Sequence, residues 1–196
     1  MAAQRKGLLP AAGLLLVVSL IYTAFSYNRL VKQEEAVKLA WSELQNLYGR
    51  RADMVPTLVT IVQGAAAFEQ ELLREVTEAR SRAGTLQLTG GPNAENYRQQ
   101  EGAQAALAQS MNRVIAVVEA YPDLKATKNF IYLQAQLEGT ERRIKVARKD
   151  FNAAVQAYNA LVRQFPSSLT ARTFGFREKE GFRADAAADT APEVTF

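Results

Sequence analysis

Residues 129–165 read NFIYLQAQLEGTERRIKVARKDFNAAVQAYNALVRQF, and this stretch decides the fold. Large apolar residues return every seven positions, and a companion set follows three residues later. Such a sustained heptad is typical of a long helix that packs in coiled-coil style. It predicts one helix over residues 124–165, ended by Pro166. The two sets are Phe130, Leu137, Ile144, Phe151, Tyr158 and Phe165, and Leu133, Thr140, Ala147, Ala154 and Leu161.

Three more segments upstream carry apolar stripes at helical period. The first is expected to end at a corner over Gly49–Asp53, where a glycine follows the stripe and Asp53 can cap the next helix. The second ends at the glycine-rich connection Gly84–Asn93, and the third runs from Asn93 to Tyr121. Short corners imply antiparallel neighbours. The predicted fold is therefore all-α: an N-terminal transmembrane helix that continues into an elongated antiparallel four-helix bundle.

The N-terminal region contains an uncharged run from Gly7 to Phe25. As a helix it would be roughly 28 Å long, close to the hydrocarbon thickness of a bilayer. A cleaved signal peptide is one alternative, but the run is long for that and Tyr22 stands where a small residue is wanted. A buried core helix is another, although it would rarely be apolar on all sides. Residues 7–25 are thus predicted to span the lipid bilayer as a single-pass anchor.

The basic residues that flank the anchor give only a weak indication of its orientation in the membrane. Arg5 and Lys6 favour a cytoplasmic N-terminus, whereas Arg29, Lys32 and Lys38 follow the other end of the run. We expect the N-terminus inside and the bundle on the extracytoplasmic side.

Composition excludes several kinds of chemistry. The chain of 196 residues has no cysteine and no histidine. Disulfides, thiolate or imidazole metal sites, and triads that use histidine are therefore impossible. No glycine-rich phosphate loop occurs, and Glu69 is the one acid in phase with an apolar stripe. We expect no enzyme activity, no catalytic residues, no cofactor and no metal. A net charge of only +4 and the lack of RNA-binding signatures argue against a nucleic-acid partner.

The densest charge cluster lies on the heptad helix. A solvated helix face explains most such clusters, and the functional alternative is a docking surface for an acidic partner. The candidate docking residues are Arg142, Arg143, Arg148 and Lys149.

Periodicity stops after Pro166, so residues 167–196 are expected to form an irregular tail. Its first half interleaves Phe174, Phe176 and Phe182 with basic residues. These rings are predicted to pack on the end of the bundle or, alternatively, to contact a membrane surface. Residues 184–196 are rich in alanine and acids and are predicted to be disordered. The expected domains are the anchor at 1–26, the bundle at 27–166 and the tail at 167–196.

Several motifs resemble the LemA family, in order over roughly residues 20–182. They include Tyr27-Asn28-Arg29-Leu30-Val31, Ala40-Trp41-Ser42-Glu43-Leu44, Arg50-Arg51-Ala52-Asp53, Tyr121-Pro122-Asp123-Leu124 and Tyr158-Asn159. The chain departs from the family pattern at Gly49 and at Phe68-Glu69, where the family tends to have His-Glu. The resemblance implies a bacterial inner-membrane protein with a four-helix bundle, similar to members found in membrane-associated complexes and on magnetosome membranes. It implies no particular enzymatic activity.

Three functions remain open on these grounds. A helical scaffold or self-assembling interaction module in an envelope complex agrees best with a long heptad helix on an anchor. A sensor or ligand-binding bundle would use a groove lined by Trp41, Tyr48, Tyr132 and Tyr158, although core packing explains those rings better. A lipid- or envelope-remodelling factor would use the basic-aromatic tail.

Overall fold

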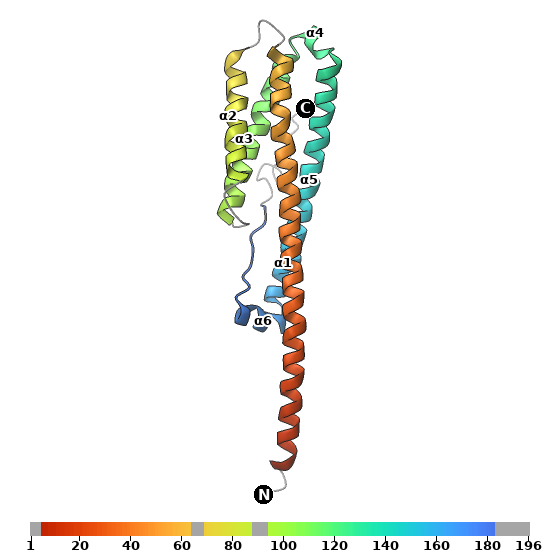
Figure 1. Ribbon diagram of the computed structural model, residues 1–196, viewed down its shortest axis with the longest axis vertical. Helices are drawn as coiled ribbons and strands as arrows, with labels where there is room; N and C mark the ends of the chain where they lie inside the picture. The colour runs from red at the N-terminus through yellow and green to blue at the C-terminus, as the bar shows by residue number, and fades with distance from the viewer. Residues whose placement is uncertain (1–4, 64–68, 88–93, 183–196) are drawn as a thin grey trace, which may run out of the picture. The chain divides into compact units, whose positions relative to one another are not determined.

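The computed structural model describes residues 5–63, 69–87 and 94–182, and every regular element in these ranges is a helix (Figure 1). The expected all-α fold is confirmed. The helices are α1 (Arg5–Gln63), α2 (Gln70–Gln87), α3 (Ala94–Val118), α4 (Pro122–Lys125), α5 (Lys128–Arg163) and α6 (Ser167–Phe174).

The chain divides into two compact units, and α1 and α5 contribute to both. We call residues 1–39 and 153–179 the membrane-side unit, because this unit contains the apolar run predicted to be the anchor, and residues 40–152 and 180–196 the bundle unit. In the bundle unit, the second part of α1 packs with α2, α3 and the first part of α5. Its core is apolar and contains Val55, Leu58, Val62, Val76, Leu107, Met111, Val114, Val118, Phe130, Leu133 and Leu137.

The first helix is longer than expected, because α1 runs without a break from Arg5 to Gln63. The predicted corner at Gly49–Asp53 is wrong. A glycine inside a helix costs only about 1 kcal/mol, and the fold offsets this by burying side chains of α1 on both sides of Gly49, among them Leu44, Tyr48 and Val55. The inward positions Val55, Leu58 and Val62 are buried as expected, but they belong to α1. The reversal to α2 lies between Gln63 and Gln70, so the predicted second helix is split there.

Pro56 lies inside α1 and has no backbone N–H, so the carbonyl of Ala52 loses its helical hydrogen bond. Arg80 of α2 replaces that donor, since its Nε lies 2.9 Å from the Ala52 oxygen. Gln63 and Gln70 flank the connection while Ala52 and Arg80 meet, so α1 and α2 are antiparallel. The bundle thereby satisfies a carbonyl that a helix in isolation would leave to water.

The third and fourth segments follow the prediction with smaller differences. Helix α3 begins within one residue of the expected Asn93, whereas Gly84 lies inside α2 rather than in a connection. The predicted helix over 124–165 is interrupted, because α4 ends at Lys125 and α5 begins at Lys128. Thr127 causes this restart: its Oγ1 accepts a hydrogen bond from the backbone N–H of Phe130 at 3.3 Å, as an N-cap does.

The heptad on α5 predicts the buried face well. Phe130, Leu137, Ile144, Phe151 and Tyr158 are all at most 7% exposed. Phe165 is the exception at 77% exposed, because α5 has already ended at Arg163. The expectation of an irregular tail is wrong for its first residues, since α6 forms over Ser167–Phe174 and ends at Gly175 with φ of 78°. The predicted disorder at 184–196 lies outside the described residues.

Candidate functional site

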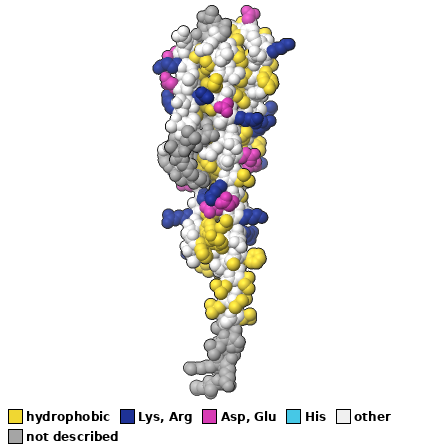
Figure 2. All heavy atoms as spheres, in the orientation of Figure 1, with side chains coloured by type: hydrophobic (Ala, Val, Ile, Leu, Met, Phe, Trp, Pro, Cys, Tyr) yellow, Lys and Arg dark blue, Asp and Glu magenta, His cyan; other side chains and the backbone are white. Residues whose placement is uncertain are grey.

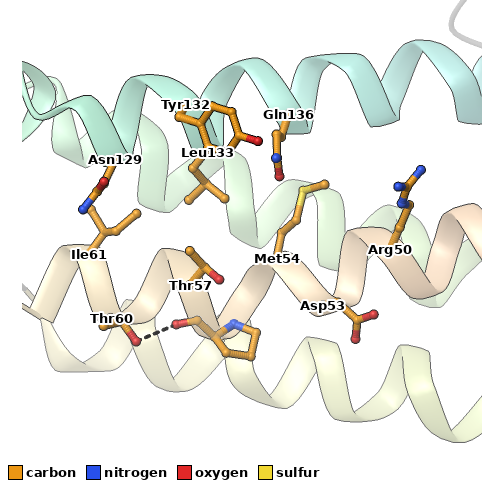
Figure 3. Close-up of a pocket in the computed structure, with 11 residues that line it drawn as sticks. Arg50, Asp53, Met54, Thr57, Thr60, Ile61, Asn129, Tyr132, Leu133 and Gln136 are labelled. Atoms are coloured by element: carbon orange, nitrogen blue, oxygen red, sulfur yellow. Dashed lines mark hydrogen bonds between the residues drawn. The ribbon is translucent and has the colours of Figure 1, made fainter.

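A groove of about 680 Å³ runs between α1 and α5 in the bundle unit (Figure 3). Met54 and Ile61 of α1 face Leu133 of α5 across it, so its floor is apolar. Tyr132 stands on the α5 side and is 67% exposed, although the sequence analysis grouped it with rings that core packing would explain. Asn129 lies at one end of the groove and Arg50 at the other.

The end at Arg50 continues into a smaller hollow that also touches Gly139, Thr140 and Arg143. Within the described residues, neither Arg50 nor Arg143 has an ion-pair partner, and both are exposed. The groove thus combines an apolar floor with two cations at one end that form no ion pair with any described residue, beside the single carboxylate of Asp53. Such an arrangement suits an apolar segment that also carries an acidic group.

The four predicted docking residues separate into two groups in the structure. Arg142, Arg143 and Lys149 are exposed on α5, and only Arg143 lines the hollow beside the groove. Arg148 is half-buried: it forms an ion pair with Glu101 of α3, and its guanidinium lies 4.8 Å from the centre of the Phe182 ring. Arg148 therefore joins parts of the bundle unit and is not free to dock a partner.

A buried polar layer crosses the bundle unit at Arg51, which is 4% exposed. Its guanidinium forms an ion pair with Glu141 of α5 and donates to the backbone and side-chain oxygens of Gln104 of α3, each at 3.2 Å. Gln100, Gln104, Ser110 and Thr140 are also buried in this unit. Polar residues within otherwise apolar stripes are the sequence signal for this buried layer. The sequence prediction instead assigned Arg51 to a helix end.

The tail phenylalanines lie in different surroundings. In the membrane-side unit, Phe174 and Phe176 meet the ring of Tyr27 edge-on at 5.0 and 5.7 Å, and Phe174 remains 53% exposed. In the bundle unit, Phe182 is 8% exposed and joins a cluster of aromatic rings. The other members of this cluster are Trp41, Tyr97 and Phe151. Phe182 is thus a core residue, and of the three rings only Phe174 is largely exposed.

Two asparagines of α5 hold the backbone of the tail. Asn152 donates to the carbonyl of Phe182 at 3.1 Å and accepts from its N–H at 2.8 Å. Asn159 does the same for Lys179, at 2.7 and 2.9 Å. The signal in the sequence is an aromatic residue followed by asparagine, repeated after seven residues as Phe151-Asn152 and Tyr158-Asn159. The sequence pointed to Asn159 only as part of the family motif Tyr158-Asn159, and it predicted no contact for either amide.

Three of the four aromatic residues proposed to line a ligand groove are buried instead. Trp41, Tyr48 and Tyr158 are at most 4% exposed. Burial raises the pKa of Tyr48 to about 12, although the positive charges of Arg148 and Arg51 act in the opposite direction. Burial, together with the negative charge of Glu34, also raises the pKa of Tyr158 to about 12. These phenols stay neutral at physiological pH and serve packing.

Comparison with known proteins identifies the family. A model of the LemA family matches residues 40–196. The chain belongs to the LemA family. The resemblance to this family seen in the sequence is thereby confirmed.

Magnetosome proteins are among the relatives of this LemA-family chain. Magnetosome protein MamQ 2 of Paramagnetospirillum magneticum is 26% identical over 217 aligned residues, which cover 98% of this chain and 79% of the relative. Magnetosome protein MamQ of Magnetospirillum gryphiswaldense is 25% identical, with 96% and 76% covered. Protein LemA of Metamycoplasma hominis is 23% identical, with 74% and 63% covered. None of these names is that of an enzyme.

The membrane assignment rests on α1. Among the described residues it is the one helix long and apolar enough to cross a bilayer, with a mean hydropathy of 1.5 in its most apolar window. A signal sequence near an N-terminus passes the same test of length and composition. A core helix also passes it but is mostly buried, whereas only 11% of this window is buried. The features agree with a membrane-associated helical protein of the LemA family.

No three acidic side chains in residues 13–63, 69–85 and 96–182 lie close enough to hold a metal ion. Glu69, the acid predicted to face inward, is exposed just before α2. The groove between α1 and α5 is therefore the feature of the bundle unit on which a function can be argued.

Proposed function

We propose that this LemA-family chain is a non-catalytic, single-pass inner-membrane protein whose bundle is a scaffold in a bacterial envelope complex. Residues 1–26 anchor the chain, residues 27–166 form the bundle that docks partners, and residues 167–196 form the tail. The N-terminus is cytoplasmic and the bundle extracytoplasmic in this proposal. The observation that carries it is the groove between α1 and α5, with its apolar floor and its unpaired Arg50 and Arg143.

The occupant we propose is an amphipathic helix with an acidic residue near one end, from a partner protein or a second copy of the chain. Two parallel or antiparallel helices leave a groove that accepts a third helix through anchors spaced by three and four residues. An exposed aromatic side chain continues the floor outward, since Tyr132 lines the groove and is 67% exposed. Arg50 and Arg143 supply the charge that selects an acidic partner and sets its direction.

A small-molecule sensor is the second candidate, because a volume of about 680 Å³ lies in the range of ligand sites. The scaffold is preferred because the groove is an open trough between two helices, whereas small-molecule sites enclose most of the ligand.

In-cell photocrosslinking tests the scaffold. A benzoylphenylalanine at position 132, in the full chain in its membrane, is expected to give one discrete adduct. The pair Arg50→Glu and Arg143→Glu should reduce that adduct several-fold, because it reverses the charge at the end of the groove. Mass spectrometry of the adduct then distinguishes a second copy from another protein.

The matched control places the same crosslinker at Gln109, which is exposed on α3 away from the groove residues. Equal adducts from both positions, or an adduct unaffected by the charge reversal, would contradict docking in the groove. Loss of the Tyr132 adduct on addition of a small molecule that raises the melting temperature would favour the sensor.

A further inference from the structure

Large apolar side chains are exposed in the membrane-side unit, beside α6 and the end of the apolar run. Phe25 and Phe165 are 76% and 77% exposed, and Leu169 and Phe174 are 58% and 53% exposed. Figure 2 shows hydrophobic side chains gathered on this part of α1 and around α6. Water-facing rings of this size are unusual on a soluble surface, and a contiguous group marks an interaction site.

The position of Phe25 on α1 places this group at the end of the apolar run, because Phe25 and Phe165 line the same cavity. The apolar run ends at Phe25, and the first charged residue after it is Arg29, about one helical turn further. Headgroup layers add roughly 5–8 Å to each side of the hydrocarbon core. Residues 26–30 would therefore lie among lipid headgroups, where aromatic rings are enriched and basic side chains reach phosphates. The long side chain of Lys32 can reach the same layer from half a turn further along.

A cavity of about 610 Å³ opens at this level. Tyr22, Phe25 and Leu30 of α1 line one side, and Leu161, Phe165 and Pro166 line the other. Arg29 and Lys32 also line it. The cavity thus has apolar walls and two cations, the combination that an acyl chain with an anionic headgroup requires.

Ser26 is a second, independent sign of a ligand. It lines the same cavity and is 6% exposed, and its hydroxyl has no hydrogen-bond partner among the described residues. Buried hydroxyls are nearly always hydrogen-bonded, because leaving one unpaired is unfavourable. An oxygen of a lipid headgroup or glycerol in the cavity would supply the missing acceptor.

The charge of this unit favours an anion. Residues 26–39 and 153–179 hold seven basic and three acidic side chains. The three acids each lie near a base: Glu34 near Lys179, Glu35 near Lys38 and Glu178 near Arg163. Within the described residues, the other four bases form no ion pair: Arg29, Lys32, Arg172 and Arg177. Their charges remain available to a phosphate.

We propose that this cavity binds an anionic phospholipid of the leaflet that borders the bundle. Its phosphate lies against Arg29 and Lys32, an ester or headgroup oxygen accepts from Ser26, and an acyl chain packs on Phe25 and Phe165. The inference rests on the membrane anchoring within the proposed function and is independent of the scaffold role. A lipid is the natural occupant because the cavity opens where lipids are the most concentrated ligand.

Native mass spectrometry of the full chain in mild detergent tests this site. Graded phosphatidylglycerol or phosphatidylcholine is added, and bound lipid is counted. The wild-type chain is expected to retain phosphatidylglycerol preferentially. The pair Arg29→Gln and Lys32→Gln should weaken retention on the order of twentyfold, because each basic residue at an anionic surface contributes about a factor of five. Both residues are exposed, so the pair leaves packing unchanged.

The matched control is the pair Lys128→Gln and Lys145→Gln, which removes the same charge from exposed positions of the bundle unit and should leave retention unchanged. Ser26→Ala should weaken retention about threefold, the share of one hydrogen bond. Equal retention of the two lipids by the wild-type chain would overturn the site. An equal loss of retention in the Lys128→Gln/Lys145→Gln and the Arg29→Gln/Lys32→Gln variants would also overturn it. Displacement of the lipid by millimolar inorganic phosphate would overturn the lipid assignment in favour of a free anion.

A separate measurement distinguishes a wrong lipid-site hypothesis from a wrong membrane-anchor hypothesis. A chain that alkaline carbonate extracts from membranes would contradict the anchoring itself. A chain that stays in the membrane pellet yet binds both lipids equally would contradict only the lipid site.

Discussion

The sequence around Arg51 predicts that this residue lies at the end of a helix, whereas in the structure it is buried in the core of the bundle unit. A glycine followed by two arginines is a common helix terminus, because cations stabilise the negative end of a helix. In the structure α1 continues, and Arg51 turns inward to Glu141 and Gln104. A buried arginine needs several partners to offset its lost hydration. Those partners come from α3 and α5, so no window of local sequence contains the information.

The buried tyrosines predict how stability depends on pH. The pKa of Tyr48 is about 12 in the folded chain, against 10.0 for an exposed tyrosine. Between pH 10 and 12 the unfolded chain releases this proton while the folded chain keeps it. The free energy of unfolding therefore falls by up to about 1.4 kcal/mol per pH unit in that window and is unaffected by Tyr48 below pH 10. Because the chain has no histidine, we also expect no histidine-linked change near pH 6.5.

Thermal unfolding of the full chain in detergent at pH 8, 9, 10.5 and 11.5 checks this expectation. Tyr48→Phe should show a smaller loss of melting temperature above pH 10 than the wild type, because it removes one titrating phenol. Identical losses in both chains would contradict the assignment. Because lysines also titrate in this pH range, the effect of Tyr48 is the difference between the melting-temperature losses of the wild type and of Tyr48→Phe.

At the scale of elements, apolar periodicity identifies faces better than ends. The heptad on α5 correctly predicts five buried residues from Phe130 to Tyr158, because the inward face depends only on position along a helix. It misses the restart at Thr127 and the end at Arg163, because a cap is a local hydrogen bond that overrides the pattern. Pro56 likewise suggests a first turn, yet it lies well inside α1.

The hydrogen bond from Arg80 to the Ala52 carbonyl, which Pro56 leaves without a helical donor, gives a test at this scale. Arg80→Met removes the donor to the Ala52 carbonyl and is expected to cost about 1 kcal/mol, since an unpaired, half-buried carbonyl is left. Pro56→Ala restores a backbone N–H that can bond Ala52 within α1. In that background Arg80→Met should cost less than about 0.5 kcal/mol.

A double-mutant cycle from denaturant unfolding of the full chain measures the difference. We expect a coupling of roughly 0.5–1 kcal/mol between the two substitutions. Additive effects would mean that Arg80 stabilises the bundle through its other contacts rather than by replacing the missing donor.

At the scale of the whole molecule, the chain contains two compact units that share α1 and α5, and each unit presents its own surface. The bundle unit has the groove at Arg50 and Arg143, and the membrane-side unit has the cavity at Ser26. The domain boundaries at residues 26 and 166 remain predictions. The division of the structure depends instead on which residues contact one another, and the tail contributes to both units.

Membrane orientation is the prediction that belongs to the whole molecule. The chain has no cysteine, so one introduced thiol reports one position. Ser81→Cys places it on the exposed surface of α2. A membrane-impermeant maleimide applied to cells with a permeable outer layer should label position 81 without lysis, because the bundle is expected to be extracytoplasmic. Ala2→Cys is the matched control and should react only after lysis. The reverse pattern would place the bundle in the cytoplasm.

The sequence by itself determined the helical class, the apolar run of α1, the buried faces of α1 and α5, and the family. These properties depend on composition, on local periodicity or on motifs, and each can be read within one segment. The tertiary structure alone decided that α1 passes Gly49, that Arg51 is buried, that Asn152 and Asn159 hold the tail, and where the groove and the cavity lie. Each of these depends on which segments meet. These tertiary contacts join residues tens of positions apart, and their spacing along the chain follows no period that the sequence could reveal.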